Sequence, residues 1–163
     1  MHSNAKTLTR FYKAFAQLDA NTMASCYAEN ASFQDPAFTL KGREQIGGMW
    51  NMLCSATKDK GMAQWKLEFS DIQADDAKGS AHWEAHYLFS ATGKNVHNII
   101  DGQFTFTPDG FIASHNDHFD FWRWSRQALG LPGLLLGWTP LLKMMVQKQA
   151  SSGLQKFIAK RKK

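Results

Sequence analysis

Two polar residues, His115 and Asp117, fall on what the alternation of residue types predicts to be an apolar, aromatic face of a β-strand. They are two positions apart, so both side chains point to the same face, with Cα atoms about 7 Å apart. A buried imidazole or carboxylate needs hydrogen-bond partners or a shifted pKa, and both situations are common at sites of acid–base chemistry. His115 could donate to a developing oxyanion while Asp117 or Asp35 moves the proton. The alternative is a structural His–Asp hydrogen bond that fills a polar gap in the core.

The predicted turns indicate what surrounds this pair. With a two-residue hairpin loop at 92–93 and the next turn at 107–110, Gly102 lies opposite His115, and Trp83 lies beyond it. A glycine in the middle of a strand often marks the close approach of another group, so we expect room beside His115 under an aromatic wall. All of these pairings depend on the register, and a slip of one residue would move the pair to the other face.

One interior pocket is therefore the expected site. Asp35 ends a short extended run before Pro36, and a proline disfavours helical geometry in the residue that precedes it. We expect Asp35 to reach the same interior as the His–Asp pair. The catalytic candidates are Asp35, His115 and Asp117, and the ligand-binding candidates are Trp50, Trp83, Tyr87, Asn98 and Phe119.

The opposite face of the predicted sheet carries a second polar cluster. Glu84 is expected opposite Asp101, with His82 and His86 on either side. The two histidines are four residues apart, about 13 Å on a strand, so they cannot bind one metal ion together. We expect this face to be solvated or to contact a second subunit, and we expect neither a metal nor a cofactor.

The period of the apolar residues predicts the elements that position these groups. Helical spacing over 8–18, around 23–27 and over 46–54 predicts three helices, the second capped by Asp19 and the third entered at Gly42. From Trp65 the period changes to two, which predicts four strands. Helices followed by an antiparallel meander indicate an α+β fold. The expected strands lie near 63–74, 77–91, 94–107 and 110–122.

The composition indicates one folded domain. The chain has 163 residues, of which 44% are hydrophobic and 13% aromatic, enough for a substantial core. Its longest apolar stretch, residues 129–146, is interrupted by prolines, glycines and Lys143, so no membrane span is expected. The N-terminus shows no signal-peptide pattern, and Cys26 and Cys54 are expected to be buried, reduced thiols. These features predict a cytoplasmic location.

Charge divides the chain unevenly. Residues 1–122 hold ten Lys or Arg and all fourteen acidic residues, whereas 123–163 hold nine Lys or Arg and no acid. Thr139-Pro140 can begin a helix, and an apolar stripe follows. Such a stripe has to be buried, so we expect it to pack on its own domain or on a second subunit and to help close the pocket. Contact with an anionic membrane surface is the less favoured alternative, and no nucleic acid is expected. The stripe consists of Leu141, Leu142, Met145, Val146, Ala150, Leu154, Phe157 and Ile158.

Two short motifs carry a resemblance to a known family. They are CYAENASFQDP at 26–36 and KGREQI at 41–46. Both resemble ketosteroid isomerases and SnoaL-like polyketide cyclases of the nuclear transport factor 2-like superfamily, over roughly residues 5–122. The resemblance implies an α+β cone at 1–122, in which a curved antiparallel sheet wraps around the N-terminal helices. Residues 123–163 then form a basic amphipathic helical extension of the same domain.

The resemblance to ketosteroid isomerase makes Asp35 the candidate general base. That enzyme combines an Asp base with an oxyanion hole formed by a tyrosine and a protonated Asp. In this chain Phe11 takes the place of the tyrosine, and Gly102 that of the acid. Tyr12 is adjacent to Phe11 but points about 100° away on the helix. A steroid isomerase of that mechanism is therefore not expected.

The resemblance to SnoaL-like cyclases fits the polar residues better, since those enzymes use an aspartate on the last part of the sheet. It implies an isomerase, cyclase or hydrolase that acts by Asp/His acid–base chemistry on a small apolar molecule bearing a carbonyl or an epoxide. It also implies a homodimer that pairs through the outer face of the sheet. The alternative is a non-catalytic ligand-binding or dimerising module of the same fold.

Overall fold

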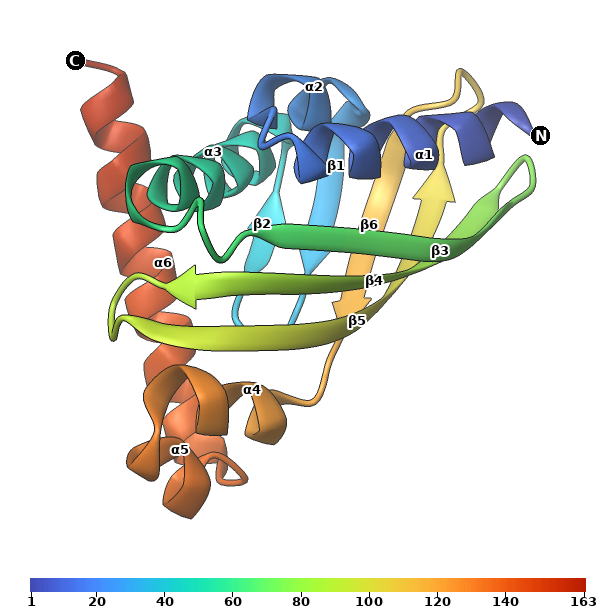
Figure 1. Ribbon diagram of the computed structural model, residues 1–163. Coiled ribbons are helices and arrows are strands. Elements are labelled where there is room, and N and C mark those ends of the chain that lie inside the picture. The colour runs from blue at the N-terminus through green and yellow to red at the C-terminus, as the bar shows by residue number, and fades with distance from the viewer.

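A curved six-stranded sheet wraps around the N-terminal helices, and three further helices follow the last strand (Figure 1). The computed structural model describes residues 1–163. The helices are α1 (Ser3–Ala16), α2 (Ala20–Ser25), α3 (Arg43–Lys60), α4 (Phe121–Leu129), α5 (Leu131–Leu136) and α6 (Pro140–Arg161). The strands are β1 (Tyr27–Gln34), β2 (Thr39–Lys41), β3 (Lys66–Ala74), β4 (Lys78–Phe89), β5 (Lys94–Phe106) and β6 (Ile112–His118).

The sheet confirms the expected fold and adds one parallel pair. Its strand order is β2-β1-β6-β5-β4-β3. The meander from β3 to β6 is antiparallel, but β1 pairs parallel with β6, so the sheet is mixed. This pairing places the N-terminal strand, which runs toward Asp35, directly beside the strand that carries His115 and Asp117.

Side-chain caps set where three of the helices begin. The Asp19 carboxylate accepts from the Thr22 amide at the start of α2, and the Asp120 carboxylate accepts from the Arg123 amide, both at 3.0 Å. The Asp120 cap is why the chain turns into α4 at residue 121, where a strand had been expected to continue to 122. Thr139 caps α6, as predicted.

The register differs from the expected one by two residues, while the two faces are as predicted. The β4–β5 loop has four residues rather than two, so Phe89 pairs with Lys94 and Gly102 with Ala81. Across the next turn, Gly102 pairs with Asp117 instead of His115. A two-residue shift preserves the alternation of a strand, so the same side chains still point inward. A bulge beside Phe106 changes the alternation locally, and Ile112 is buried in place of Ala113.

The core fills the inside of the curved sheet. One cluster of 27 buried hydrophobic residues includes much of the inner face of α1, the buried side of α3 and the inward positions of the strands. Aromatic rings dominate its centre: Phe11, Tyr12, Phe15, Tyr27, Phe33, Trp50, Trp83 and Phe104 all belong to it.

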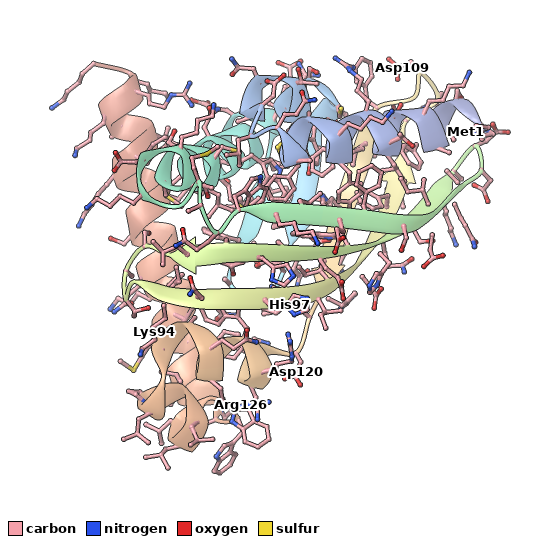
Figure 2. The ribbon with its side chains drawn as sticks, viewed as in Figure 1. Met1, Lys94, His97, Asp109, Asp120 and Arg126 are labelled. Atoms are coloured by element: carbon pink, nitrogen blue, oxygen red, sulfur yellow. The ribbon has the colours of Figure 1, made fainter.

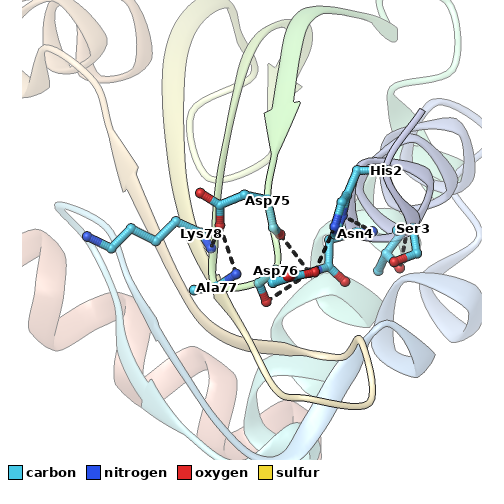
Figure 3. A network of polar contacts seen from close by, with 8 residues as sticks. His2, Ser3, Asn4, Asp75, Asp76, Ala77 and Lys78 are labelled. Carbon is cyan, nitrogen blue, oxygen red and sulfur yellow. Dashed lines mark hydrogen bonds and ion pairs between the residues drawn. The ribbon is translucent and has the colours of Figure 1, made fainter.

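The N-terminus of α1 is tied to the tip of the β3–β4 hairpin (Figure 3). The Asn4 side chain donates to the backbone carbonyls of Asp75 and Asp76 at 2.9 and 3.2 Å. His2 Nε2 lies 2.9 Å from an Asp76 carboxylate oxygen. Within the turn, the Asp75 carboxylate accepts from two backbone amides, those of Ala77 and Lys78. These contacts hold the helix against the sheet it covers.

The C-terminal helix α6 crosses α3 and packs against it (Figure 1), and only part of the predicted stripe is buried. Leu154 belongs to the main core, with Ala150 and Ile158 packed against it. A Cβ on Gly48 of α3 would come within 2.8 Å of Ile158, which shows how closely the two helices approach. Leu141 and Met145, which the stripe placed in the buried face, are exposed.

Docking of α6 predicts a difference between two leucines of the same helix. Leu154 is 3% exposed and Leu141 is 66% exposed. We expect Leu154→Ala to lower the free energy of unfolding by about 2 to 4 kcal/mol, because it opens a cavity in the core. The matched control Leu141→Ala should change it by less than about 0.5 kcal/mol. Urea unfolding of both variants checks this, and equal effects would mean that α6 does not contribute to the core in solution.

Candidate functional site

A chain of hydrogen bonds runs through the buried interior from α3 to β6. The Trp50 indole donates to the Tyr27 hydroxyl at 3.1 Å, and that hydroxyl lies 2.7 Å from His115 Nδ1. The other ring nitrogen, His115 Nε2, lies 2.9 Å from a carboxylate oxygen of Asp117. A consistent assignment has Tyr27 donate to Nδ1 while Nε2–H donates to Asp117. The imidazole is thus held at both ends by protein groups.

Aromatic rings enclose this imidazole. The Phe104 ring centroid is 4.2 Å from that of His115, and the Phe33 centroid is 4.9 Å away. The His115 side chain is 0% exposed. Rings therefore occupy the space where an open pocket beside His115 was expected.

Asp117 receives a second hydrogen bond and lies over the mid-strand glycine. The Trp83 indole donates to the same carboxylate oxygen of Asp117 as His115 does, at 3.3 Å. A Cβ on Gly102 would come within 3.0 Å of that oxygen. The missing side chain of Gly102 thus makes room for Asp117 and for the Phe104 ring, whereas the sequence had suggested room beside His115.

Two buried tyrosines near this pair were missed by the sequence analysis. Tyr27 had been expected in a helix, and its hydroxyl instead bonds His115. Tyr12 is fully buried, and its hydroxyl has no hydrogen-bond partner in the protein. Burial raises the pKa of Tyr12 well above its usual value, and the charge of Asp117 raises it further. Tyr12 therefore supplies the interior with an unused hydroxyl close to Asp117, although Phe11 occupies the position of the family's tyrosine.

Asp35 directly follows β1, and one of its two carboxylate oxygens is hydrogen-bonded. One oxygen accepts from the backbone amides of Ala37 and Phe38, at 2.7 and 2.6 Å, which fixes the turn after Pro36. Burial raises the pKa of Asp35 from 3.8 to about 7, against the lowering effect of those amides, and the charge of Asp117 raises it further. Asp117 is thus near enough to influence the ionisation of Asp35.

The raised pKa of Asp35 predicts how stability depends on pH. Between pH 3.8 and about 7 the folded protein holds a proton that the unfolded chain has released. The stabilisation from this group is complete below that window and is lost as pH rises through it. We expect the free energy of unfolding to fall by on the order of 2 kcal/mol across the window, relative to Asp35→Asn, since solvent at this half-buried carboxyl moderates the full effect.

Asparagine is the matched replacement because it keeps the oxygen that accepts from Ala37 and Phe38 but cannot titrate there. Urea unfolding of the wild type and of Asp35→Asn at a series of pH values checks the prediction. Parallel pH profiles for the two proteins would show that Asp35 titrates at its ordinary pKa.

A second group lies toward α4 and includes two of the expected ligand-binding residues. The Trp124 indole donates to the Tyr87 hydroxyl at 2.8 Å, and the Phe119 ring lies 6.4 Å from Trp124. Burial raises the pKa of Tyr87, and the charge of Asp35 adds to this effect. Asp35 therefore lies within electrostatic reach of both Tyr87 and Asp117. Asn98 is buried on the same inner face and pairs with Ala85.

The described hollows and the outer face lie apart from this interior. One hollow of about 370 Å³ follows α1 beside Arg10 and Lys13, and another, of about 510 Å³, lies where Asn4 approaches Asp109. On the outer face His82 bonds Asp101 at 2.8 Å, and no group of three or more metal-ligating side chains is arranged to hold an ion. The homodimer expected through this face stays a prediction.

The structure thus brings most of the predicted residues to one interior. One hydrogen-bond chain contains His115, Asp117, Trp50 and Trp83. Asp35 lies within electrostatic reach of Asp117, and Tyr87 lies within reach of Asp35. The signal in the sequence that could have revealed Tyr27 is its place in the motif at 26–36. Tyr27 is the first residue of β1, the strand that pairs with β6.

Comparisons with solved structures support the fold. An epoxide hydrolase/cyclase-like enzyme, SalBIII, described for pyran ring formation in the polyether salinomycin, is 17% identical, with a TM-score of 0.60 over 72% of this chain and 90% of its own. An LEH-like epoxide hydrolase of M. tuberculosis is also 17% identical, with a TM-score of 0.62 over 82% and 96% of the two chains. An NTF2-like protein of unknown function from Burkholderia pseudomallei is 15% identical, with a TM-score of 0.63 over 78% and 98%.

Sequence comparison reaches the family level. No curated protein matches the chain. The family model for the SnoaL-like domain matches residues 8–126, which include most of α1, all of α2 and α3, the whole sheet and the first part of α4. The match spans well over half of the 163 residues and contains Asp35, His115 and Asp117. The chain therefore belongs to the SnoaL-like domain family of the NTF2-like superfamily.

Proposed function

We propose that the protein opens an epoxide ring in a small apolar molecule by acid–base chemistry, with Asp35 as the acid and Asp117 as the base. One observation carries the proposal: β1 pairs with β6 so that Gln34 lies beside Asn116, which brings the next residues of the two strands, Asp35 and Asp117, to the same place, and the pKa of Asp35 is raised to about 7. A pair of carboxyl groups in different environments can hold one proton and accept another at neutral pH. Two of the structural neighbours are described as epoxide hydrolases or epoxide hydrolase-like enzymes, which fits this chemistry.

The proposed step balances without a cofactor. Asp117 takes a proton from water as the water oxygen attacks a ring carbon. The carbon–oxygen bond of the epoxide breaks, and Asp35 protonates the departing oxygen, giving a vicinal diol. Transfer of the proton from Asp117 to Asp35 restores both groups. In a ring-forming version, a hydroxyl of the substrate takes the place of water.

The surrounding residues have supporting roles in this proposal. His115 and Trp83 both donate to one oxygen of Asp117, which would hold its carboxylate in one orientation. Because both nitrogens of His115 are engaged, we assign it a positioning role instead of the oxyanion donation that the sequence suggested. The aromatic rings pack against His115 in this structure, so in this proposal they move aside when the substrate enters and then supply its apolar surroundings.

The test is turnover of a panel of apolar epoxides in isotopically labelled water, with diol formation followed by mass spectrometry. We expect one labelled oxygen per diol. The rate should fall as pH rises above about 7, because Asp35 then lacks the proton that it donates. A rate that keeps rising above this pH would remove Asp35 from the acid role.

A non-catalytic ligand-binding module is the second candidate. The internally satisfied His115 favours it, because a fully paired imidazole can also serve only to stabilise the core. Saturable binding of the same epoxides, with no diol formed at any pH, would select this reading over the enzyme.

A further inference from the structure

In helix α5 the leucines face outward, whereas Gly133 and the glycine that ends the helix, Gly137, face the rest of the protein. A Cβ on Gly133 would come within 1.9 Å of the Ser125 carbonyl, and one on Gly137 within 2.0 Å of the Ser125 hydroxyl. Only residues without a side chain permit this approach to α4. The Trp122 indole also donates to the Leu134 carbonyl at 3.2 Å, which fixes α5 in place. The usual burial pattern of a surface helix is thus reversed.

The exposed apolar surface continues into the first turns of α6. Most of the large apolar side chains that the protein exposes lie in this segment. Isolated exposed leucines are ordinary, but a contiguous cluster of this kind marks an interaction site. Its main members are each 48% to 70% exposed: Leu131, Leu134, Leu135, Trp138, Leu141 and Met144. We call this surface the α5–α6 patch.

The charges around the patch are all of one sign. Lys143 and Lys148 are exposed on α6. The guanidinium of Arg126, which is labelled in Figure 2, lies over the Trp122 ring, 4.6 Å from its centroid. The Lys94 side chain lies beside Gly130, where α5 begins. No acidic residue occurs from 123 to the end of the chain. The preceding acid, Asp120, is engaged in capping α4.

We propose that the α5–α6 patch docks on an anionic lipid bilayer. Leucines, a tryptophan and flanking basic residues are what an interfacial segment needs to insert apolar side chains below a negatively charged surface. No helix of the protein is long and apolar enough to cross a membrane, so the contact is with the surface. A second copy of the chain is a less suitable partner. A two-fold contact through this patch would bring the basic residues of one copy close to the basic residues of the other.

The patch is held in a preformed orientation. The second half of α6 is anchored on α3 through Leu154 and through an ion pair between Lys162 and Glu44 at 2.7 Å. Midway along α6, the Gln147 side chain donates to the Pro36 carbonyl at 3.0 Å, at the turn that follows Asp35. The helix that presents the patch therefore also contacts the loop of a proposed catalytic residue. The docking proposal stands without the proposed activity.

Vesicle sedimentation of the full chain tests the proposal. We expect binding to vesicles of phosphatidylcholine mixed with phosphatidylglycerol and much weaker binding to phosphatidylcholine alone. The double variant Leu135→Ser/Trp138→Ser should bind at least about tenfold more weakly, because it removes apolar area that the bilayer would cover. Lys143→Gln/Lys148→Gln should lose about fivefold per charge and most of the salt sensitivity.

Met62→Ser is the matched control, because Met62 is 58% exposed but lies in the turn after α3, away from the patch. It should bind like the wild type, and thermal unfolding should show all variants folded. Absence of binding to the anionic vesicles, or equal loss in the Met62 control, would overturn the proposal. So would sedimentation equilibrium showing that the wild type is a dimer and that Leu135→Ser/Trp138→Ser is a monomer, which would assign the patch to a second copy.

Discussion

Replacing Asp117 by asparagine should reduce turnover of an epoxide substrate about a thousandfold while leaving the fold intact. The amide keeps the oxygen that accepts from His115 and Trp83, but it cannot take the proton of the attacking water. Removal of a positioned base typically costs a factor of this size. The measurement is kcat for diol formation, with substrate affinity determined separately, since a base that acts in the chemical step should affect kcat far more than KM.

The same substitution on the outer face is the control. Asp101 also bonds a histidine, His82, at 2.8 Å, but it lies on the exposed side of the sheet. Asp101→Asn should leave kcat within about twofold of the wild type, because it is remote from the interior. If Asp117→Asn turned over substrate as fast as Asp101→Asn, Asp117 would be a structural partner of His115 and the proposed base would be wrong.

Replacing His115 by alanine should cost about 3 to 5 kcal/mol of the free energy of unfolding. The substitution removes a fully buried ring and takes one of two hydrogen-bond partners from the Tyr27 hydroxyl and from the Asp117 carboxylate. Cavity formation and unpaired buried polar groups each contribute a few kcal/mol. Urea unfolding at constant pH measures the loss.

Two other variants separate the loss of buried hydrogen bonds from the loss of the buried ring. Tyr27→Phe removes only the hydroxyl that links Trp50 to His115, and it should lower the free energy of unfolding by about 1 to 2 kcal/mol. His118→Ala, on the same strand but exposed on the opposite face, should change stability by less than about 0.5 kcal/mol. A small effect of His115→Ala, comparable with that of His118→Ala, would mean that the interior chain of hydrogen bonds adds little to stability.

The alternation of residue types was enough to predict which side chains face inward. His115 and Asp117 are buried and His118 is exposed, although the pairing of the strands was displaced by two residues. Side chains alternate with a period of two, so an even displacement preserves the face of every residue. The length of the β4–β5 loop and the bulge beside Phe106 depend on backbone pairing, which the residue pattern does not encode clearly.

The sequence predicted the ionisable groups of the candidate site but not the hydrogen bonds that join them to Tyr27. His115 and Asp117 stood out because ionisable residues on an apolar face are unusual, and Asp35 stood out because it precedes Pro36 in the motif at 26–36. Tyr27 did not, because a tyrosine is compatible with either a helix or a buried strand. Only the parallel pairing of β1 with β6 brings its hydroxyl to His115, which lies 88 positions away along the chain.

The sequence by itself determined the α+β class, the buried polar pair and the one-sided charge of the last 41 residues. Tertiary structure decided what the C-terminal apolar residues do. A periodicity argument assigns leucines to the buried face and treats glycines as neutral. The backbone of α4 approaches Gly133 of α5 too closely for any side chain there, and the Ser125 and Trp122 side chains leave no room for one at Gly137, which ends α5. The glycines therefore take the inner face, and the leucines are left on the surface, because α4 excludes every larger residue from these two positions.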